Sequence, residues 1–280
     1  MSSPAAGADS AEHRSSVGNL VVIGFIGGVL SGLFAIGGGI LMVPLLVWRA
    51  GLDQRRAAAT SLVAIVPTAF VSSVTYLLNG AVDLIAGIVI AVGAIGGAVI
   101  GSRLLRRISV PALRWMFILF IVAVAARLLF VAPQRGHAVD LSLQIGLGYV
   151  ALGLVMGVAS GLFGIGGGII AVPLLITFFA ASDLVAKGTA LLVSILTSVV
   201  GTAANTRAGL VDVRAGLVLG TVAAIASVPA VLVALAIPAR LSTTTFAALL
   251  LIVAAQLSSK AVQARRASSV TTATGSEGTS

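Results

Sequence analysis

The feature that most restricts the fold is a pair of apolar stretches that each contain three consecutive glycines. Residues 31–46 read SGLFAIGGGILMVPLL and residues 160–175 read SGLFGIGGGIIAVPLL, with 13 of the 16 positions identical. Both stretches are apolar enough for a lipid bilayer, yet each glycine costs a helix about 1 kcal/mol relative to alanine. The chain therefore contains, twice and 129 residues apart, an apolar segment that is interrupted in the same place.

Long apolar runs fill most of the remaining chain. Hydrophobic residues make up 59% of the sequence and charged residues only 9%, whereas a soluble domain has about 25% charged residues. A helix needs about 20 apolar residues to cross the hydrocarbon core. The sequence predicts an all-α, polytopic transmembrane helix bundle with about eight hydrophobic segments: 18–48, 57–78, 84–102, 112–132, 143–180, 186–206, 214–238 and 243–259.

The duplication extends beyond the glycine-broken stretches. At the same offset Thr60 matches Thr189, and Asp83 matches Asp212. Internal repeats are typical of secondary transporters, whose site lies at the repeat interface; the alternative is that duplication only builds a large bundle. The expected organisation is a disordered tail (1–17), a first transmembrane repeat (18–132), a connecting loop (133–142), a second transmembrane repeat (143–260) and a second disordered tail (261–280).

The basic residues favour one relative orientation of the repeats. If each broken segment enters and leaves on the same side, the repeats are inverted and 13 of the 17 basic residues share one side. If each broken segment crosses once, the repeats are parallel and the split is 9 to 8. The positive-inside rule therefore favours inverted repeats. The four basic residues expected on the outer side are Arg127, Arg135, Lys187 and Arg240.

Each glycine triplet is expected to end one helix and start another. Pro44 and Pro173 would then lie near the start of the new helices, where proline is tolerated. Broken backbone at membrane depth persists only inside protein or beside a water-filled cavity. The free N–H groups of a new helix attract anions. We therefore expect the triplets to bind substrate: Gly37, Gly38, Gly39, Gly166, Gly167 and Gly168.

Other glycines recur every four residues, a pattern that lets helices pack closely in membranes. We interpret these as packing positions, and packing is also the alternative explanation for the triplets. The spaced glycines are Gly24, Gly28 and Gly32, then Gly93, Gly97 and Gly101, and finally Gly153, Gly157 and Gly161.

Polar side chains inside the apolar segments supply the remaining candidates. Intramembrane cation sites usually need a carboxylate, and the segments contain almost none away from their ends. Asp83 and Asp212 could couple transport to protons, although helix capping is the favoured interpretation. The hydroxyl and amide candidates for substrate binding are Thr60, Ser61, Thr189 and Asn205.

Several function classes are disfavoured. The net charge of +9 comes from basic residues beside the apolar runs, so it indicates membrane orientation and nucleic-acid binding is not expected. The chain has no cysteine, and its histidines, His13 and His137, lie in a polar tail and a connecting loop. We therefore expect no metal, no cofactor and no enzymatic activity. The first apolar run is too long for a cleaved signal peptide, so we expect it in the mature protein.

The doubled signature resembles the TauE/SafE family of sulfite and organosulfonate exporters. The likeness rests on residues 32–46 and 161–175 and extends to 59–62 and 188–191; Ala35 and Ala59 depart from the glycines of the second repeat. The resemblance implies export of small oxyanions such as sulfite across a bacterial inner membrane. The expected partners are this oxyanion and membrane lipid, and a homodimer is left open. An anion channel and a membrane assembly factor without cargo are the alternative functions on this scaffold.

Overall fold

The computed structural model describes residues 17–130 and 143–275, and every regular element in them is a helix. Eight helices are long and apolar enough to cross a membrane, and α2 and α7 are shorter. The predicted all-α polytopic bundle is confirmed. The helices are α1 (Val17–Phe34), α2 (Gly39–Arg49), α3 (Gln54–Leu78), α4 (Leu84–Arg107), α5 (Val110–Phe130), α6 (Leu143–Phe163), α7 (Gly168–Phe179), α8 (Asp183–Thr206), α9 (Val213–Ala236) and α10 (Ala239–Gly275).

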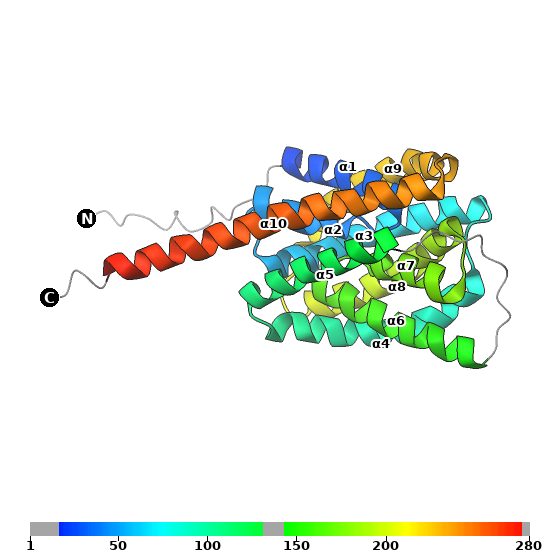
Figure 1. Ribbon diagram of the computed structural model, residues 1–280, viewed down its shortest axis with the longest axis horizontal. Coiled ribbons are helices and arrows are strands. Elements are labelled where there is room, and N and C mark those ends of the chain that lie inside the picture. The colour runs from blue at the N-terminus through cyan, green and yellow to red at the C-terminus, as the bar shows by residue number, and fades with distance from the viewer. Residues whose placement is uncertain (1–16, 131–142, 276–280) are drawn as a thin grey trace, which may run out of the picture.

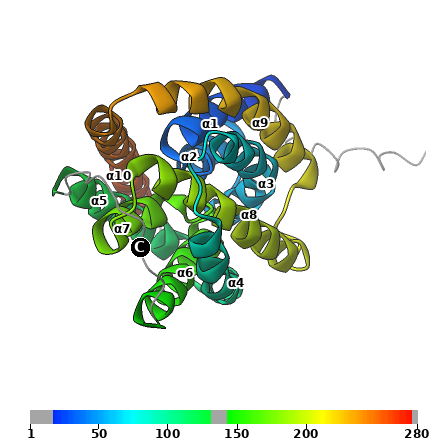
Figure 2. The ribbon, with the colours of Figure 1, turned by 90° about the vertical axis from the view of Figure 1, so that its right-hand side faces the viewer.

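Helices α3 and α8, one from each repeat, form the interior of the bundle, while α5 and α10 lie at its edge (Figure 2). Helix α1 packs against α9, and α6 packs against α4. The spaced glycines lie in these two contacts. A Cβ atom added to Gly24 would lie 2.7 Å from the Leu219 carbonyl oxygen of α9, and one added to Gly161 would lie 2.8 Å from the Ser102 nitrogen of α4. Their predicted role in close packing is confirmed.

Apart from residues 35–38 and 164–167, the described helix connections lie at two ends of the bundle (Figure 1). We call one the basic end, where the connections 50–53, 108–109 and 207–212 lie. There Arg55 donates a hydrogen bond to the Ile108 carbonyl, and Arg106 donates one to the Ala204 carbonyl at 3.0 Å. The opposite end holds the connections 79–83, 180–182 and 237–238, and there the Asp83 N–H bonds the Thr189 hydroxyl at 2.9 Å.

The described basic residues are distributed unequally between these two ends. Of the basic residues expected on the outer side, Lys187 and Arg240 lie near the starts of α8 and α10, at the opposite end. The arginines near the basic end are Arg49, Arg55, Arg56, Arg103, Arg106, Arg107, Arg114, Arg207 and Arg214.

The helix boundaries differ from the predicted segments at the C-terminus. The sequence predicts a disordered tail over 261–280, but α10 continues to Gly275. Residues 260–274 contain no glycine or proline and include alanine, glutamine and arginine, which favour helix. Nothing local therefore stops α10 when its apolar part ends. The predicted tail before Val17, the connecting loop 133–142 and residues 276–280 lie outside the described residues.

Candidate functional site

The glycine triplets break both long apolar segments. Helix α1 ends at Phe34 and α2 begins at Gly39, while α6 ends at Phe163 and α7 begins at Gly168. The residues that precede the new helices, Gly38 and Gly167, have left-handed backbones with φ of 78° and 82°. A residue with a Cβ atom resists this conformation, so glycine explains how the chain reverses here.

The two breaks lie directly against each other. A Cβ atom added to Gly39 would lie 2.7 Å from Cα of Ile165 and would also clash with the Gly164 carbonyl oxygen. One added to Gly168 would clash with the Ala35 carbonyl oxygen. The first residue of each half-helix is thus in contact with the broken backbone of the other repeat. The structure brings together the two triplets that the sequence predicted as one site.

The three glycines of a triplet have different surroundings. Cβ atoms added to Gly37 and Gly166 would lie 3.0 and 3.1 Å from the same atom, Cγ2 of Ile65. In contrast, one added to Gly38 would lie 2.7 Å from the Gly27 carbonyl oxygen, within its own helical hairpin. The first glycine of each triplet therefore faces a side chain that both breaks share, whereas Gly38 faces its own hairpin.

The starts of both half-helices are buried and carry free donors. Gly39 and Gly168 are buried, and neither α2 nor α7 has a side-chain cap. The hydrogen bonds within the described residues include none donated by the N–H groups of these two glycines. Buried backbone donors without acceptors are rare in proteins. Two of them at adjacent helix starts form an environment that favours a negatively charged ligand.

The threonine candidates connect the repeats. Oγ1 of Thr60 accepts a hydrogen bond from the Asp212 N–H at 3.1 Å, and Oγ1 of Thr189 accepts one from the Asp83 N–H at 2.9 Å. These two bonds are equivalent under the 129-residue offset, and each one crosses from one repeat to the other. They place Thr60 towards the basic end and Thr189 towards the opposite end. The structure does not bring the two threonines together.

Ser61 is the hydroxyl candidate that contacts a break. Its Oγ donates hydrogen bonds to the Gly164 carbonyl at 2.6 Å and to the Ala58 carbonyl at 2.9 Å. It therefore fixes the turn that precedes the second triplet. The equivalent position in the second repeat is Ala190, which cannot make such a bond.

Asn205 is fully buried near the C-terminal end of α8. Neither its amide nitrogen nor its amide oxygen has a hydrogen-bond partner among the described residues. Ser198 and Ser102 are also buried without partners. A buried amide without partners costs about 1–3 kcal/mol, so this position favours a bound polar group such as water.

Both aspartate candidates are helix caps. The side chain of Asp83 accepts a hydrogen bond from the Ala86 N–H at the start of α4, and Asp212 accepts one from the Ala215 N–H at the start of α9, each at 2.9 Å. The favoured capping interpretation is confirmed. Proton coupling through these residues remains a prediction.

A polar cavity of about 700 Å³ opens between the repeats at the basic end. Buried Thr60 borders it, and the next residue, Ser61, contacts the Gly164 carbonyl beside the second break. The cavity therefore borders the same turn of α3 that contacts the second break. Its lining residues are Ala50, Gly51, Leu52, Asp53, Arg56, Thr60, Gly209, Leu210, Val211, Asp212, Val213 and Arg214.

A buried ion pair at the opposite end is absent from the sequence-based candidates. Nζ of Lys187 lies 2.7 Å from Oδ2 of Asp183 and donates a hydrogen bond to Oγ of Ser242 at 2.8 Å. The lysine is only 3% exposed. The sequence analysis treats Lys187 only as a basic residue that sets the orientation in the membrane. Asp183, four residues earlier in the same helix, indicates an ion pair with it.

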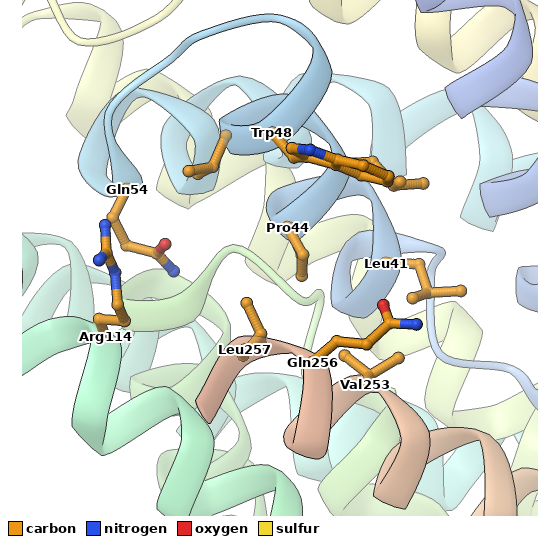
Figure 3. Close-up of a pocket in the computed structure, with 10 residues that line it drawn as sticks. Leu41, Pro44, Trp48, Gln54, Arg114, Val253, Gln256 and Leu257 are labelled. Atoms are coloured by element: carbon orange, nitrogen blue, oxygen red, sulfur yellow. The ribbon is translucent and has the colours of Figure 1, made fainter. Parts of the chain in front are cut away.

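A second cavity of about 280 Å³ lies on the outer face of α2, between α2, α5 and α10 (Figure 3). Pro44, Trp48 and Arg114 line it, and no glycine of either triplet does. Pro44 is the sixth residue of α2, and Pro173 is the sixth residue of α7, so both lie in the second helical turn. The structure thus places Pro44 at the side of the bundle, away from the contact between the breaks.

Comparisons with known proteins agree with this architecture. The sequence profile described as sulfite exporter TauE/SafE matches residues 2–128 and 149–278. The chain is 28% identical to the probable membrane transporter protein YunE of Bacillus subtilis, over 69% of this chain and 79% of the relative. It is 31% identical to a probable membrane transporter protein of Xylella fastidiosa, over 63% of this chain and 67% of the relative.

A plant protein is similar over a shorter stretch. The sulfite exporter TauE/SafE family protein 6 of Arabidopsis thaliana is 34% identical over 36% of this chain and 23% of the relative. No solved structure matches the chain. Eight apolar helices, transporter relatives and a profile match over both repeats identify a multi-pass membrane protein. The chain belongs to the sulfite exporter TauE/SafE family of membrane transporters.

Proposed function

We propose that this protein exports small oxyanions, sulfite or a short organosulfonate, across a bacterial inner membrane. The anion binds between the starts of α2 and α7 and interacts with free backbone N–H groups at Gly39 and Gly168. No cofactor takes part, and no covalent chemistry occurs. Membership of the sulfite exporter TauE/SafE family supports this substrate class.

The single observation that carries the proposal is the contact between the two half-helix starts. Each start is buried, has no side-chain cap and has an N–H group without an acceptor among the described residues. Helix starts attract negative charge through their dipole and their free donors. Backbone donors also suit transport, because a site without an arginine binds the anion firmly enough to select it but not so firmly that release is slow.

We propose further that the repeats are inverted and that the basic end faces the cytoplasm. Thr60 and Asp212 meet at the basic end, whereas their equivalents Thr189 and Asp83 meet at the opposite end. Described arginines are concentrated at the basic end, as the positive-inside rule requires of a cytoplasmic surface. The polar cavity at that end is then the route by which a cytoplasmic anion reaches the breaks.

The membrane potential can drive this export without a protonatable residue. Moving one negative charge outward gains about 2.3 kcal/mol for each 100 mV, inside negative. The capping roles of Asp83 and Asp212 support this view, because each carboxylate already binds a helix N–H. We therefore expect an electrogenic export of a monoanion.

An anion channel is the alternative, and the difference between the two ends favours a transporter. A channel in its conducting state is open at both ends. Here the basic end is hollow, while Lys187, Asp183 and Ser242 are packed together and buried at the opposite end.

Efflux from proteoliposomes tests the function. Vesicles loaded with sulfite, methanesulfonate, sulfate or phosphate are compared under an imposed potential. We expect sulfite or methanesulfonate efflux that saturates with concentration and increases with inside-negative potential. Efflux that does not saturate would identify a channel. Movement of none of these anions, together with clear transport of a cation or a neutral solute, would refute the proposal.

Cysteine labelling tests the orientation, since the chain has no native cysteine. Single cysteines at Arg56 in the polar cavity and at exposed Gly80 are treated with a membrane-impermeant thiol reagent in intact cells. We expect labelling at position 80 and protection at position 56. The reverse pattern would place the basic end outside.

A further inference from the structure

Ile65 of α3 fills the space between the two glycine breaks. The side chain is fully buried. Its Cγ2 atom lies 3.0 Å from a Cβ atom added to Gly37 and 3.1 Å from one added to Gly166, and its Cδ1 atom lies 3.0 Å from one added to Gly39. One side chain therefore contacts both triplets and the first residue of a half-helix.

The equivalent position in the second repeat has a different side chain. Residue 194 is serine, and its Cβ lies 3.5 Å from a Cβ atom added to Gly166. The Ser194 hydroxyl donates a hydrogen bond to the Ala190 carbonyl of its own helix at 2.7 Å. The interface between the breaks is thus apolar and branched on the α3 side, but small and polar on the α8 side.

We propose that Ile65 determines which anions the site accepts, by limiting the space between the half-helices. This inference rests on the proposed function. Because Ile65 packs against both triplets and beside Gly39, an anion bound between the two half-helix starts would lie next to this side chain. The branched side chain has few χ1 alternatives in a helix, so it can make only limited room.

The restriction has a defined chemical consequence. Sulfite consists of three oxygens around one sulfur, and methanesulfonate adds one methyl group. Longer alkanesulfonates carry the same charged group and differ only in the apolar chain that must fit beside Ile65. The structure therefore predicts that anion selectivity follows the length of the alkyl chain, and that shortening residue 65 relaxes this dependence.

The test is a series of substitutions at position 65: Ile65→Val, Ile65→Ala and Ile65→Ser. The matched control is Leu62→Ala, one turn earlier in α3. Leu62 is also fully buried, but its Cδ1 lies 2.8 Å from a Cβ atom added to Gly201 of α8, whereas Ile65 packs against the triplets. Initial efflux rates of sulfite, methanesulfonate and butanesulfonate are measured for each variant, together with the amount of folded protein.

We expect Ile65→Ala and Ile65→Ser to raise the butanesulfonate-to-sulfite rate ratio about tenfold, which is typical for one or two methylenes in a binding pocket. Ile65→Val should raise it by a smaller factor, and Leu62→Ala should leave it unchanged. If Ile65→Ala does not accumulate, Ile65→Val decides the question, because it removes only one methylene.

The outcomes separate this inference from the function on which it rests. Wild-type protein that moves none of the anions contradicts the proposed function. Wild-type protein that exports sulfite, combined with equal rate ratios for the Ile65 variants and Leu62→Ala, overturns the role of Ile65 alone. A higher ratio in the control than in the Ile65 variants overturns it as well, since the effect would then come from loosened packing.

Discussion

The two ends of the bundle are built from equivalent positions of the two repeats, but they differ in packing. At the opposite end Lys187 binds Asp183 and Ser242, and these side chains are buried. The positions 129 residues before Lys187 and Asp183 are Ala58 and Gln54. The basic end therefore has no equivalent ion pair, and a polar cavity opens there.

A second pair of positions follows the same pattern. Tyr76 is fully buried at the opposite end, and its hydroxyl donates a hydrogen bond to the Gly32 carbonyl at 2.9 Å. Its equivalent at the basic end is Asn205, whose amide has no partner among the described residues. Duplication thus provides one scaffold twice, while a few large or charged side chains in one copy make the two ends differ.

The largest change in stability is expected when Lys187 is replaced. Lys187→Met leaves the buried Asp183 carboxylate without its partner, which costs about 3–5 kcal/mol in comparable cases. We expect a much lower thermal unfolding temperature in detergent than for the wild type. The double variant Lys187→Met with Asp183→Asn should recover most of the loss. The control is Arg240→Met, which removes a positive charge at an exposed position. If Lys187→Met is no less stable than this control, the ion pair does not stabilise this end.

The turns before the two triplets provide the next test. Gly164→Ala adds a Cβ atom that would lie 2.5 Å from the Ser61 Oγ and would clash with the Ala58 carbonyl, and overpacking of this kind costs about 1–3 kcal/mol. Its equivalent Ala35 already has a strained φ of 57°, so Ala35→Gly should stabilise by up to about 1 kcal/mol. Thermal unfolding of both variants measures the difference. Equal effects of the two changes would contradict the described asymmetry of the turns.

Replacing the two threonines that connect the repeats, Thr189 and Thr60, should lower the stability by unequal amounts. Thr189→Val removes the acceptor of the Asp83 N–H and should cost about 1 kcal/mol. Thr60→Val removes the acceptor of the Asp212 N–H but borders the polar cavity, where water can replace the lost bond. We therefore expect a smaller loss for Thr60→Val. Hydrogen exchange at the two aspartate amides measures both effects, and a larger change at Asp212 would contradict the prediction.

The smallest effect is expected at the two capping aspartates. Asparagine caps helices about as well as aspartate, so Asp83→Asn and Asp212→Asn should change stability by less than about 0.5 kcal/mol. If both residues act only as caps, anion efflux and its pH dependence should also be unchanged. A lost pH dependence in either variant would instead support proton coupling at that end.

The fold class and the position of the breaks can be predicted from the sequence. Apolar runs of about 20 residues with few charges indicate membrane-spanning helices, and three consecutive glycines together disfavour a helix by about 3 kcal/mol relative to alanine. The starts of α2 and α7 at Gly39 and Gly168 therefore follow from local chemistry. The spacing of the other glycines also predicted helix packing, because residues four apart lie on one helical face.

The surroundings of each break, in contrast, depend on how the helices pack and could not be predicted from the sequence. The sequence grouped Thr60 and Thr189 as site residues, yet the fold places them towards opposite ends, where each binds a helix start of the other repeat. It also brings Ile65 between the triplets and buries Lys187 against Asp183 and Ser242. The Lys187–Asp183 pair lies within one helix. All the other contacts join the two repeats or join residues more than 25 positions apart in the sequence. Periodicity within one helix carries no information about such neighbours, since they depend on how separate helices pack.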